Sequence, residues 1–211
     1  MSLDQAECGD GAVVEPQRDV RVIVSIPGQY SVADRRNARG ERRVFACRAV
    51  YLSAHEIGLA APVSGKVGER VVADINNLGK LEGPIVRLLK QGFVISIAVG
   101  EEERNGLAAK IAWVESHKNH DTPNQRGGER FIPANPYSKI IFSDGSVETC
   151  LIVDLSVAGA AISADTVPPI RTVLGVGGVV GRVVRHFVGG FAVQFIERQS
   201  RNTVEAMVIG E

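Results

Sequence analysis

The sequence lacks the features that mark several large classes of protein. Its 24 lysine and arginine residues balance 24 aspartate and glutamate residues, so the formal net charge is zero. A chain without excess positive charge has no overall field to draw it onto DNA, RNA or an anionic membrane. No apolar run approaches the ~20 residues that a membrane-spanning helix needs. We therefore expect no DNA or RNA partner and no membrane insertion, and any bound anion must be held by a local cluster of basic side chains.

Cysteine is also scarce, because Cys8, Cys47 and Cys150 are the only three and form no C-x-x-C pair. An odd number of isolated cysteines argues against a disulfide framework. The first residues, MSLDQAECGDGAVVEPQRD, are acidic and lack the basic start and apolar core of a signal peptide. These observations predict a cytoplasmic protein with reduced thiols. Cys47 and Cys150 are expected in the core, and residues 1–20 are expected to form a flexible arm.

Short runs of Val, Ile, Leu and Ala, separated by Gly, Pro, Asn or Asp, dominate the chain and predict a mainly β protein. These runs are Arg21–Ile26, Val44–Leu52, Gly92–Ala98, Lys139–Phe142, Cys150–Leu155 and Gly190–Ile196. The segment SDGS, between KIIF and VETCLIV, predicts a tight hairpin whose central residues Asp144 and Gly145 have positive φ. One helix is predicted near residues 102–118, where apolar residues recur at helical spacing and Trp113 is expected to anchor the helix in the core.

The two halves of the chain resemble each other. GPIVRLLKQGFVISI, from Gly83, and GRVVRHFVGGFAVQF, from Gly181, carry Gly, Val, Arg and Phe in the same register. Such a repeat predicts two copies of one β-domain, residues 21–119 and 120–211, with the helix near 102–118 linking them. A small antiparallel domain removes its exposed strand edges by curling into a barrel. We therefore expect two small antiparallel β-barrels in tandem, with a two-sheet sandwich as the alternative.

Two short motifs in the second half carry the functional signal. RGGER places Arg126 and Arg130 at R-x-x-x-R spacing, and DLSVAG places Asp154, Ser156 and Gly159 at the end of a predicted strand. Alone, the first motif is more often a solvated surface, and the second is mostly a turn in which Asp or Ser bonds the backbone. Together and in this order they resemble the PilZ family, whose signature is R-x-x-x-R followed by [D/N]-x-S-x-x-G. The resemblance covers about residues 126–200.

The resemblance implies a tandem PilZ-like barrel protein whose C-terminal copy binds cyclic di-GMP through Arg126, Arg130, Asp154, Ser156 and Gly159. The ligand is a dianion with two guanines. Arginine can bind a phosphate or the guanine Hoogsteen edge with two hydrogen bonds and can stack on the base. A carboxylate accepts from guanine N–H groups, a hydroxyl bonds a phosphate or fixes the turn, and glycine admits the ligand close to the backbone. The glycine pair inside RGGER predicts a disorder-to-order or domain-rotation switch on binding.

The first half departs from this signature. Where [D/N]-x-S-x-x-G is expected, ending at Gly58, the chain has Ser53, His55 and Gly58. The segment equivalent to RGGER falls before the first strand, around Arg18 and Arg21, whereas DRRNARGERR lies between two predicted strands. We interpret the first half as a degenerate copy and its arginine-rich hairpin as a partner-docking or solvated loop.

No sequence pattern indicates catalysis. The four histidines lack the cysteine or carboxylate companions of a metal site, and no Ser/His/Asp or Cys/His arrangement is present. LGVGGVVG lacks the third glycine, the lysine and the following helix of a phosphate-binding loop. We therefore expect no enzyme, no metal and no cofactor.

The resemblance predicts a receptor that changes conformation on binding cyclic di-GMP. It would then regulate an unidentified protein partner in motility, adhesion or exopolysaccharide production. The alternative is a protein-interaction adaptor that binds no nucleotide. The sequence leaves the oligomeric state open, a homo-oligomer included.

Overall fold

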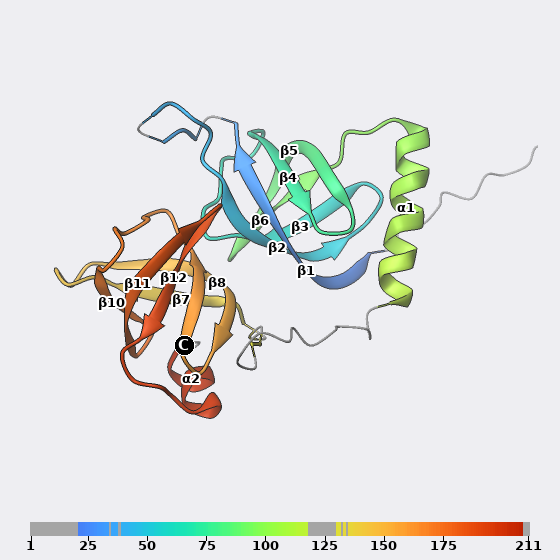
Figure 1. Ribbon diagram of the computed structural model, residues 1–211. Helices are drawn as coiled ribbons and strands as arrows, with labels where there is room; N and C mark the ends of the chain where they lie inside the picture. Colours follow the sequence, from blue (N-terminus) through green and yellow to red (C-terminus); the bar gives the residue numbers. More distant parts are fainter. Residues whose placement is uncertain are drawn as a thin grey trace, which may run out of the picture.

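The computed structural model describes residues 21–33, 35–37, 39–117, 130, 131, 133 and 135–208. In these ranges the chain forms two closed β-barrels of six strands each, drawn one above the other in Figure 1. The predicted pair of tandem barrels is confirmed, and the sandwich alternative is wrong. The predicted arm over residues 1–20 and the domain junction near 119 lie outside the described residues. No helix in the described ranges is long and apolar enough to cross a membrane.

The two barrels share one topology. The first contains β1 (Val22–Val32), β2 (Phe45–Leu52), β3 (Glu56–Ala60), β4 (Arg70–Ile75), β5 (Gly79–Leu89) and β6 (Gly92–Ser96). The second contains β7 (Tyr137–Ile141), β8 (Val147–Ser156), β9 (Gly159–Ser163), β10 (Val173–Val176), β11 (Val179–Phe187) and β12 (Gly190–Phe195). The strand order around the first barrel is β1-β2-β3-β6-β5-β4, and around the second it is β7-β8-β9-β12-β11-β10. Closure pairs every strand on both sides, so neither barrel leaves an open sheet edge.

The pairing registers show that the barrels are copies of each other. Arg87 of β5 pairs with Val94 of β6 after a bulge. Arg185 of β11 pairs with Ala192 of β12 after a bulge at the same place. The repeat predicted from the sequence is therefore confirmed at the level of individual residue pairs.

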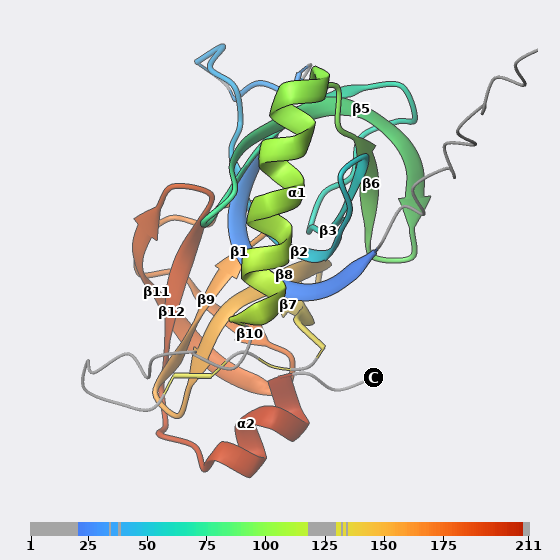
Figure 2. The same ribbon diagram turned by 90° about the vertical axis from the view of Figure 1, so that its right-hand side faces the viewer.

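A helix follows each barrel and closes one end of it. Figure 2 shows α1 (Glu101–Ser116) across the first barrel and α2 (Arg201–Val208) beneath the second. Leu107 and Ile111 of α1 are buried in the core of the first barrel, as the helical spacing predicts. The prediction for Trp113 is wrong, because its side chain is 54% exposed and stacks on His117 instead. The sequence interpretation did not include α2.

Each barrel encloses its own apolar core. In the first, the ring of Tyr30 lies 5.4 Å from that of Phe45 and 5.3 Å from that of Phe93, centroid to centroid. Burying side chains of this size stabilises a fold by about 1.5–3 kcal/mol each. Cys47 and Cys150 are both buried, as predicted. Burial raises the pKa of both thiols, to about 12 for Cys150, so both stay protonated at neutral pH.

The predicted hairpin at SDGS joins β7 to β8. Asp144 accepts hydrogen bonds from the backbone N–H and the hydroxyl of Ser146 through Oδ1, which lowers the pKa of its carboxyl. Of the two central residues only Gly145 has positive φ, at 83°. The expectation of positive φ at Asp144 is therefore wrong, and its carboxylate stabilises the turn through the hydrogen bonds to Ser146.

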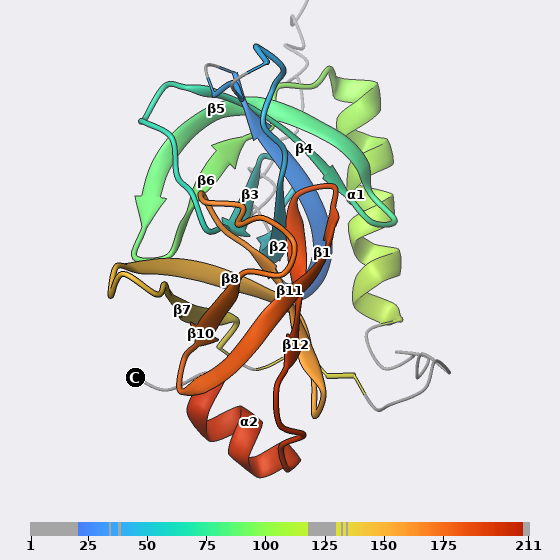
Figure 3. The same ribbon diagram turned by 60° about the vertical axis from the view of Figure 1, so that its left-hand side comes forward.

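Strand β2 forms the contact between the barrels (Figure 3). The guanidinium of Arg48, on β2, donates to the carbonyl of Ser25 at 3.2 Å and to the carbonyl of Val153, on β8, at 3.1 Å. Its side chain is buried, with 4% of the residue exposed. The hydroxyl of Tyr137 accepts from the Ala61 N–H at 2.9 Å and donates to a carbonyl of the first barrel at 2.6 Å. These buried polar contacts fix one barrel against the other.

Gly92 provides a test of the tight packing inside the first barrel. Its φ is +115°, and a Cβ at this position would lie 2.0 Å from the carbonyl oxygen of Leu59 on β3. We expect Gly92→Ala to lower the free energy of unfolding by about 3 kcal/mol in a urea titration followed by circular dichroism. Gly79→Ala is the matched control, since Gly79 has φ +85° with nothing within 4 Å. The control should lose only about 1 kcal/mol, and equal losses would contradict the packing argument.

Candidate functional site

Arg130 and Asp154 meet where β8 approaches its end. Backbone hydrogen bonds link Phe131 and Leu155 in both directions, at 2.9 and 3.0 Å, and hold Arg130 beside this strand. The pairing register of β8 with β9 shifts between Ile152 and Asp154, which indicates a bulge in β8. A bulge re-aims the side chains that follow it. The result is an ion pair of 3.0 Å between Arg130 Nη1 and Asp154 Oδ2.

The turn between β8 and β9 is fixed by Ser156. Its Oγ donates to the carbonyl of Gly159 at 3.1 Å and accepts from the N–H of Ala158 at 3.3 Å. Gly159 itself packs against β12, since a Cβ there would lie 2.3 Å from the carbonyl oxygen of Val193. Serine thus holds the turn, and glycine permits the close approach of a neighbouring strand.

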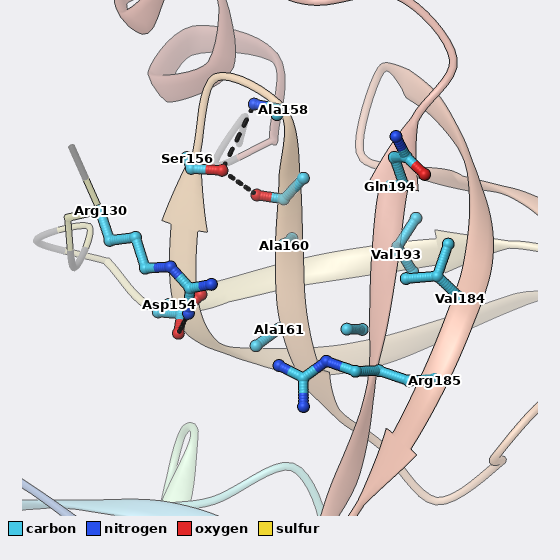
Figure 4. Close-up of a pocket in the computed structure, with 12 residues that line it drawn as sticks. Arg130, Asp154, Ser156, Ala158, Ala160, Ala161, Val184, Arg185, Val193 and Gln194 are labelled. Carbon is cyan, nitrogen blue, oxygen red and sulfur yellow. Dashed lines mark hydrogen bonds and ion pairs between the residues drawn. The ribbon is translucent and has the colours of Figure 1, made fainter. Parts of the chain in front are cut away.

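A hollow of about 250 Å³ opens beside this turn. Figure 4 shows Arg130 and Asp154 on one side of it and Arg185 of β11 reaching across toward Ala161. The floor is made of small residues from β9, and Gln194 of β12 completes the wall. The lining residues are Arg130, Asp154, Ser156, Ala158, Gly159, Ala160, Ala161, Val184, Arg185, Ala192, Val193 and Gln194.

The charges around the hollow favour an anion. Two arginines and one aspartate line it, which leaves an excess of one positive charge. The side chains of Arg130 and Asp154 are 46% and 34% exposed. An ion pair this exposed stabilises a protein by only about 0–1 kcal/mol, so a ligand can replace it at little cost. Arg185 forms no ion pair with a carboxylate in the described part of the chain, and its guanidinium lies 5.8 Å from the Phe187 ring centroid.

The structure brings together four of the five residues predicted from the motifs. Arg130, Asp154, Ser156 and Gly159 all line the same hollow. Arg126 lies outside the described residues. Arg185 is not among the residues predicted from the motifs; it is the arginine of the repeated segment GRVVRHFVGGFAVQF and matches Arg87 of GPIVRLLKQGFVISI.

The motif alignment of the first half is wrong. Tyr51 pairs with Gly58 after a bulge in β2, in the place where Asp154 pairs with Ala161 in the second barrel. Ser53 therefore matches Ser156. The sequence spacing had predicted that it would match Asp154. Its Oγ accepts from the N–H of His55 at 3.2 Å, as Ser156 does from that of Ala158.

The arginine-rich hairpin is partly a contact between the barrels. Residues 35–43 lie between β1 and β2, as predicted. Arg43 forms an ion pair with Asp165 of the second barrel, and Arg35 Nη1 lies 3.8 Å from the same carboxylate. Within the described ranges, no group of three or more His, Cys, Asp or Glu side chains is placed to hold a metal.

No family model matches the chain, and no curated protein matches it. Among solved structures it is similar to the Borreliella burgdorferi PlzA protein in complex with c-di-GMP, with 13% identity and a TM-score of 0.28, over 91% of this chain and 93% of that one. It is also similar to the Bacillus subtilis inhibitor of motility MotI/DgrA, with 11% identity and a TM-score of 0.30, over 89% and 94%. A third is YcgR in complex with c-di-GMP from Escherichia coli, with 10% identity and a TM-score of 0.27, over 86% and 80%. At these identities and TM-scores, function has to be inferred from the residues of the site.

Proposed function

We propose that the chain is a non-enzymatic receptor for cyclic di-GMP and that the ligand binds in the hollow of the second barrel. The observation that carries this proposal is the meeting of Arg130 and Asp154 beside the Ser156–Gly159 turn, with Arg185 opposite. The tandem barrels and the two motifs together agree with the resemblance to the PilZ family. The structures of PlzA and YcgR are both complexes with c-di-GMP, which agrees with the proposal as well.

Each side chain of the hollow has a task that suits this ligand. The guanidinium of Arg130 supplies a planar pair of donors for a phosphate or for guanine O6 and N7. Asp154 accepts hydrogen bonds from guanine N1–H and N2–H. Ser156 holds the turn, and Gly159 lines the hollow beside it. Arg126 and Arg185 bring the positive charge to the level that a dianion requires.

The second barrel can pass the binding event to the first through β8. Asp154 faces the hollow, whereas the carbonyl of the preceding residue, Val153, accepts a hydrogen bond from the buried Arg48 of the first barrel. A shift of β8 on binding therefore changes a contact that fixes the barrels against each other. This link supports a conformational switch that regulates a protein partner in motility, adhesion or exopolysaccharide production.

The alternative function is a protein-interaction adaptor that binds no nucleotide. The observation in its favour is the arginine-rich hairpin, in which Arg36, Arg39 and Arg42 are exposed. Under this alternative the arginines of the second barrel also contact protein, and the hollow stays empty.

Calorimetric titration of the purified chain with cyclic di-GMP separates the two functions. The receptor predicts saturable binding with a Kd of about 1 μM or tighter. GTP and cyclic AMP, titrated in the same way, should give no saturable heat, because neither presents two guanines on a cyclic dianion. Absence of heat together with an unchanged melting temperature at high ligand concentration would favour the adaptor.

A further inference from the structure

The first barrel contains the counterpart of the hollow, and its own side chains fill it. Backbone pairing shows that Val22 lies opposite Leu52, as Phe131 lies opposite Leu155 in the second barrel. Arg21 is therefore the counterpart of Arg130. The registers likewise match Arg87 with Arg185.

Two positions of the [D/N]-x-S-x-x-G signature differ between the hollow and its counterpart. Glu56 pairs with Ser96, as Gly159 pairs with Gln194. Glu56 thus occupies the glycine position of the motif, and Tyr51 occupies the position of Asp154. The serine of the motif is retained as Ser53, whose Oγ accepts from the N–H of Glu56 at 3.0 Å.

Glu56 and Tyr51 together contact both arginines of the counterpart site, Arg21 and Arg87. Glu56 Oε2 lies 3.2 Å from Arg21 Nη2 and 3.8 Å from Arg87 Nη2. Arg87 Nη2 also donates to the Tyr51 hydroxyl at 2.8 Å, and the Arg21 guanidinium lies 5.6 Å from the centroid of the Tyr51 ring. Glu56 thus supplies the negative charge, and Tyr51 the aromatic ring, that a nucleotide offers to arginine side chains.

The Tyr51 ring also occupies the space itself. A Cβ on Gly58 would lie 2.3 Å from Cε1 of Tyr51, so the ring lies directly on this glycine. In the second barrel the same floor position is Ala161, and the space above it is open. Glycine at position 58 is thus the complement of the large side chain at position 51.

We propose that the first barrel holds a latent site for the same class of ligand, a guanine-containing cyclic dinucleotide, which Tyr51 and Glu56 keep closed. The two arginines, the motif serine and its turn hydrogen bonds are retained, whereas the aspartate and glycine of the signature are replaced by the two side chains that fill the site. This inference rests on the proposed function of the second barrel, because it takes its ligand from there.

The test opens the latent site of the first barrel in a chain whose second-barrel site has been weakened by substitution. Arg130→Ala weakens binding by the second barrel by at least about 100-fold, and Tyr51→Asp with Glu56→Gly is added to restore the motif in the first. We expect the triple variant to bind cyclic di-GMP at least about tenfold more tightly than its Arg130→Ala parent in a calorimetric titration. The matched control is Arg130→Ala with Tyr51→Phe and Glu56→Gln, which removes the charge and keeps the space filled, and it should bind no better than the parent.

The outcomes separate this inference from the proposed function. If the wild-type chain fails to bind, the proposed function fails first. If the wild-type chain binds and the folded triple variant does not exceed its parent, the latent site is disproved. Should the triple variant not fold, Arg130→Ala with Tyr51→Ala and Glu56→Ala truncates two partly exposed side chains without adding a charge, and it must also exceed the parent.

Discussion

Replacing Arg130 with alanine is expected to weaken binding of cyclic di-GMP by at least about 100-fold, because the ligand loses two charge-assisted hydrogen bonds. The same substitution should leave the barrel folded. Arg130 is 46% exposed, and its ion pair with Asp154 is of a kind that contributes only about 0–1 kcal/mol to stability. Calorimetric titration and thermal unfolding of the same sample measure the two effects side by side.

Arg130→Lys separates charge from geometry at this position. Lysine keeps the positive charge and loses the planar pair of donors, so binding should fall to a level between those of the wild type and Arg130→Ala. If the Arg130→Lys variant binds the ligand as tightly as the wild type does, Arg130 acts only as a point charge. Unchanged affinity in Arg130→Ala with an intact fold would place the ligand elsewhere.

Replacing Arg185 with alanine is expected to weaken binding about tenfold or more. Arg185 reaches into the hollow from the side opposite Arg130, and no carboxylate of the described residues is within ion-pair distance of it (Figure 4). One hydrogen bond to a charged group is worth about 1.5–3 kcal/mol, which corresponds to this loss or more. The measurement is a titration at fixed ionic strength, because charge contacts weaken in salt.

Arg182 provides the matched control for Arg185. It lies on the same strand, β11, is exposed, and lines a neighbouring hollow instead of this one. Arg182→Ala removes the same unit of charge from the same barrel. We expect it to change affinity by less than about threefold, and equal losses in the two variants would show that only the overall charge of the barrel matters.

The fold could be predicted from the sequence because its signals are local. Alternating strands, turn residues and the repeat around Gly83 and Gly181 are readable without knowledge of tertiary contacts. The helix α2 was missed because its buried positions, Val204 and Val208, give only two apolar contacts at helical spacing. Trp113 was misplaced because size and hydrophobicity do not show which face of a helix meets the barrel.

The candidate site was predictable only where the motifs are intact. Arg130, Asp154, Ser156 and Gly159 lie together as expected, because a motif at the end of one strand and the start of the next is a local feature. Arg185 comes from a strand on the other side of the hollow, and only the pairing of β11 and β12 reveals it. In the first half the bulge in β2 sets the register, so Ser53 matches Ser156 although sequence spacing from Gly58 suggested otherwise.

The most direct test of the central claim is a titration of the ¹⁵N-labelled chain with cyclic di-GMP, followed through the backbone amide resonances. A ligand in the hollow of the second barrel predicts the largest shifts at residues 156–161 and around Arg185, with residues 53–58 of the first barrel unchanged. Shifts concentrated in the arginine-rich hairpin or in the first barrel, or no shifts at saturating ligand, would contradict the account.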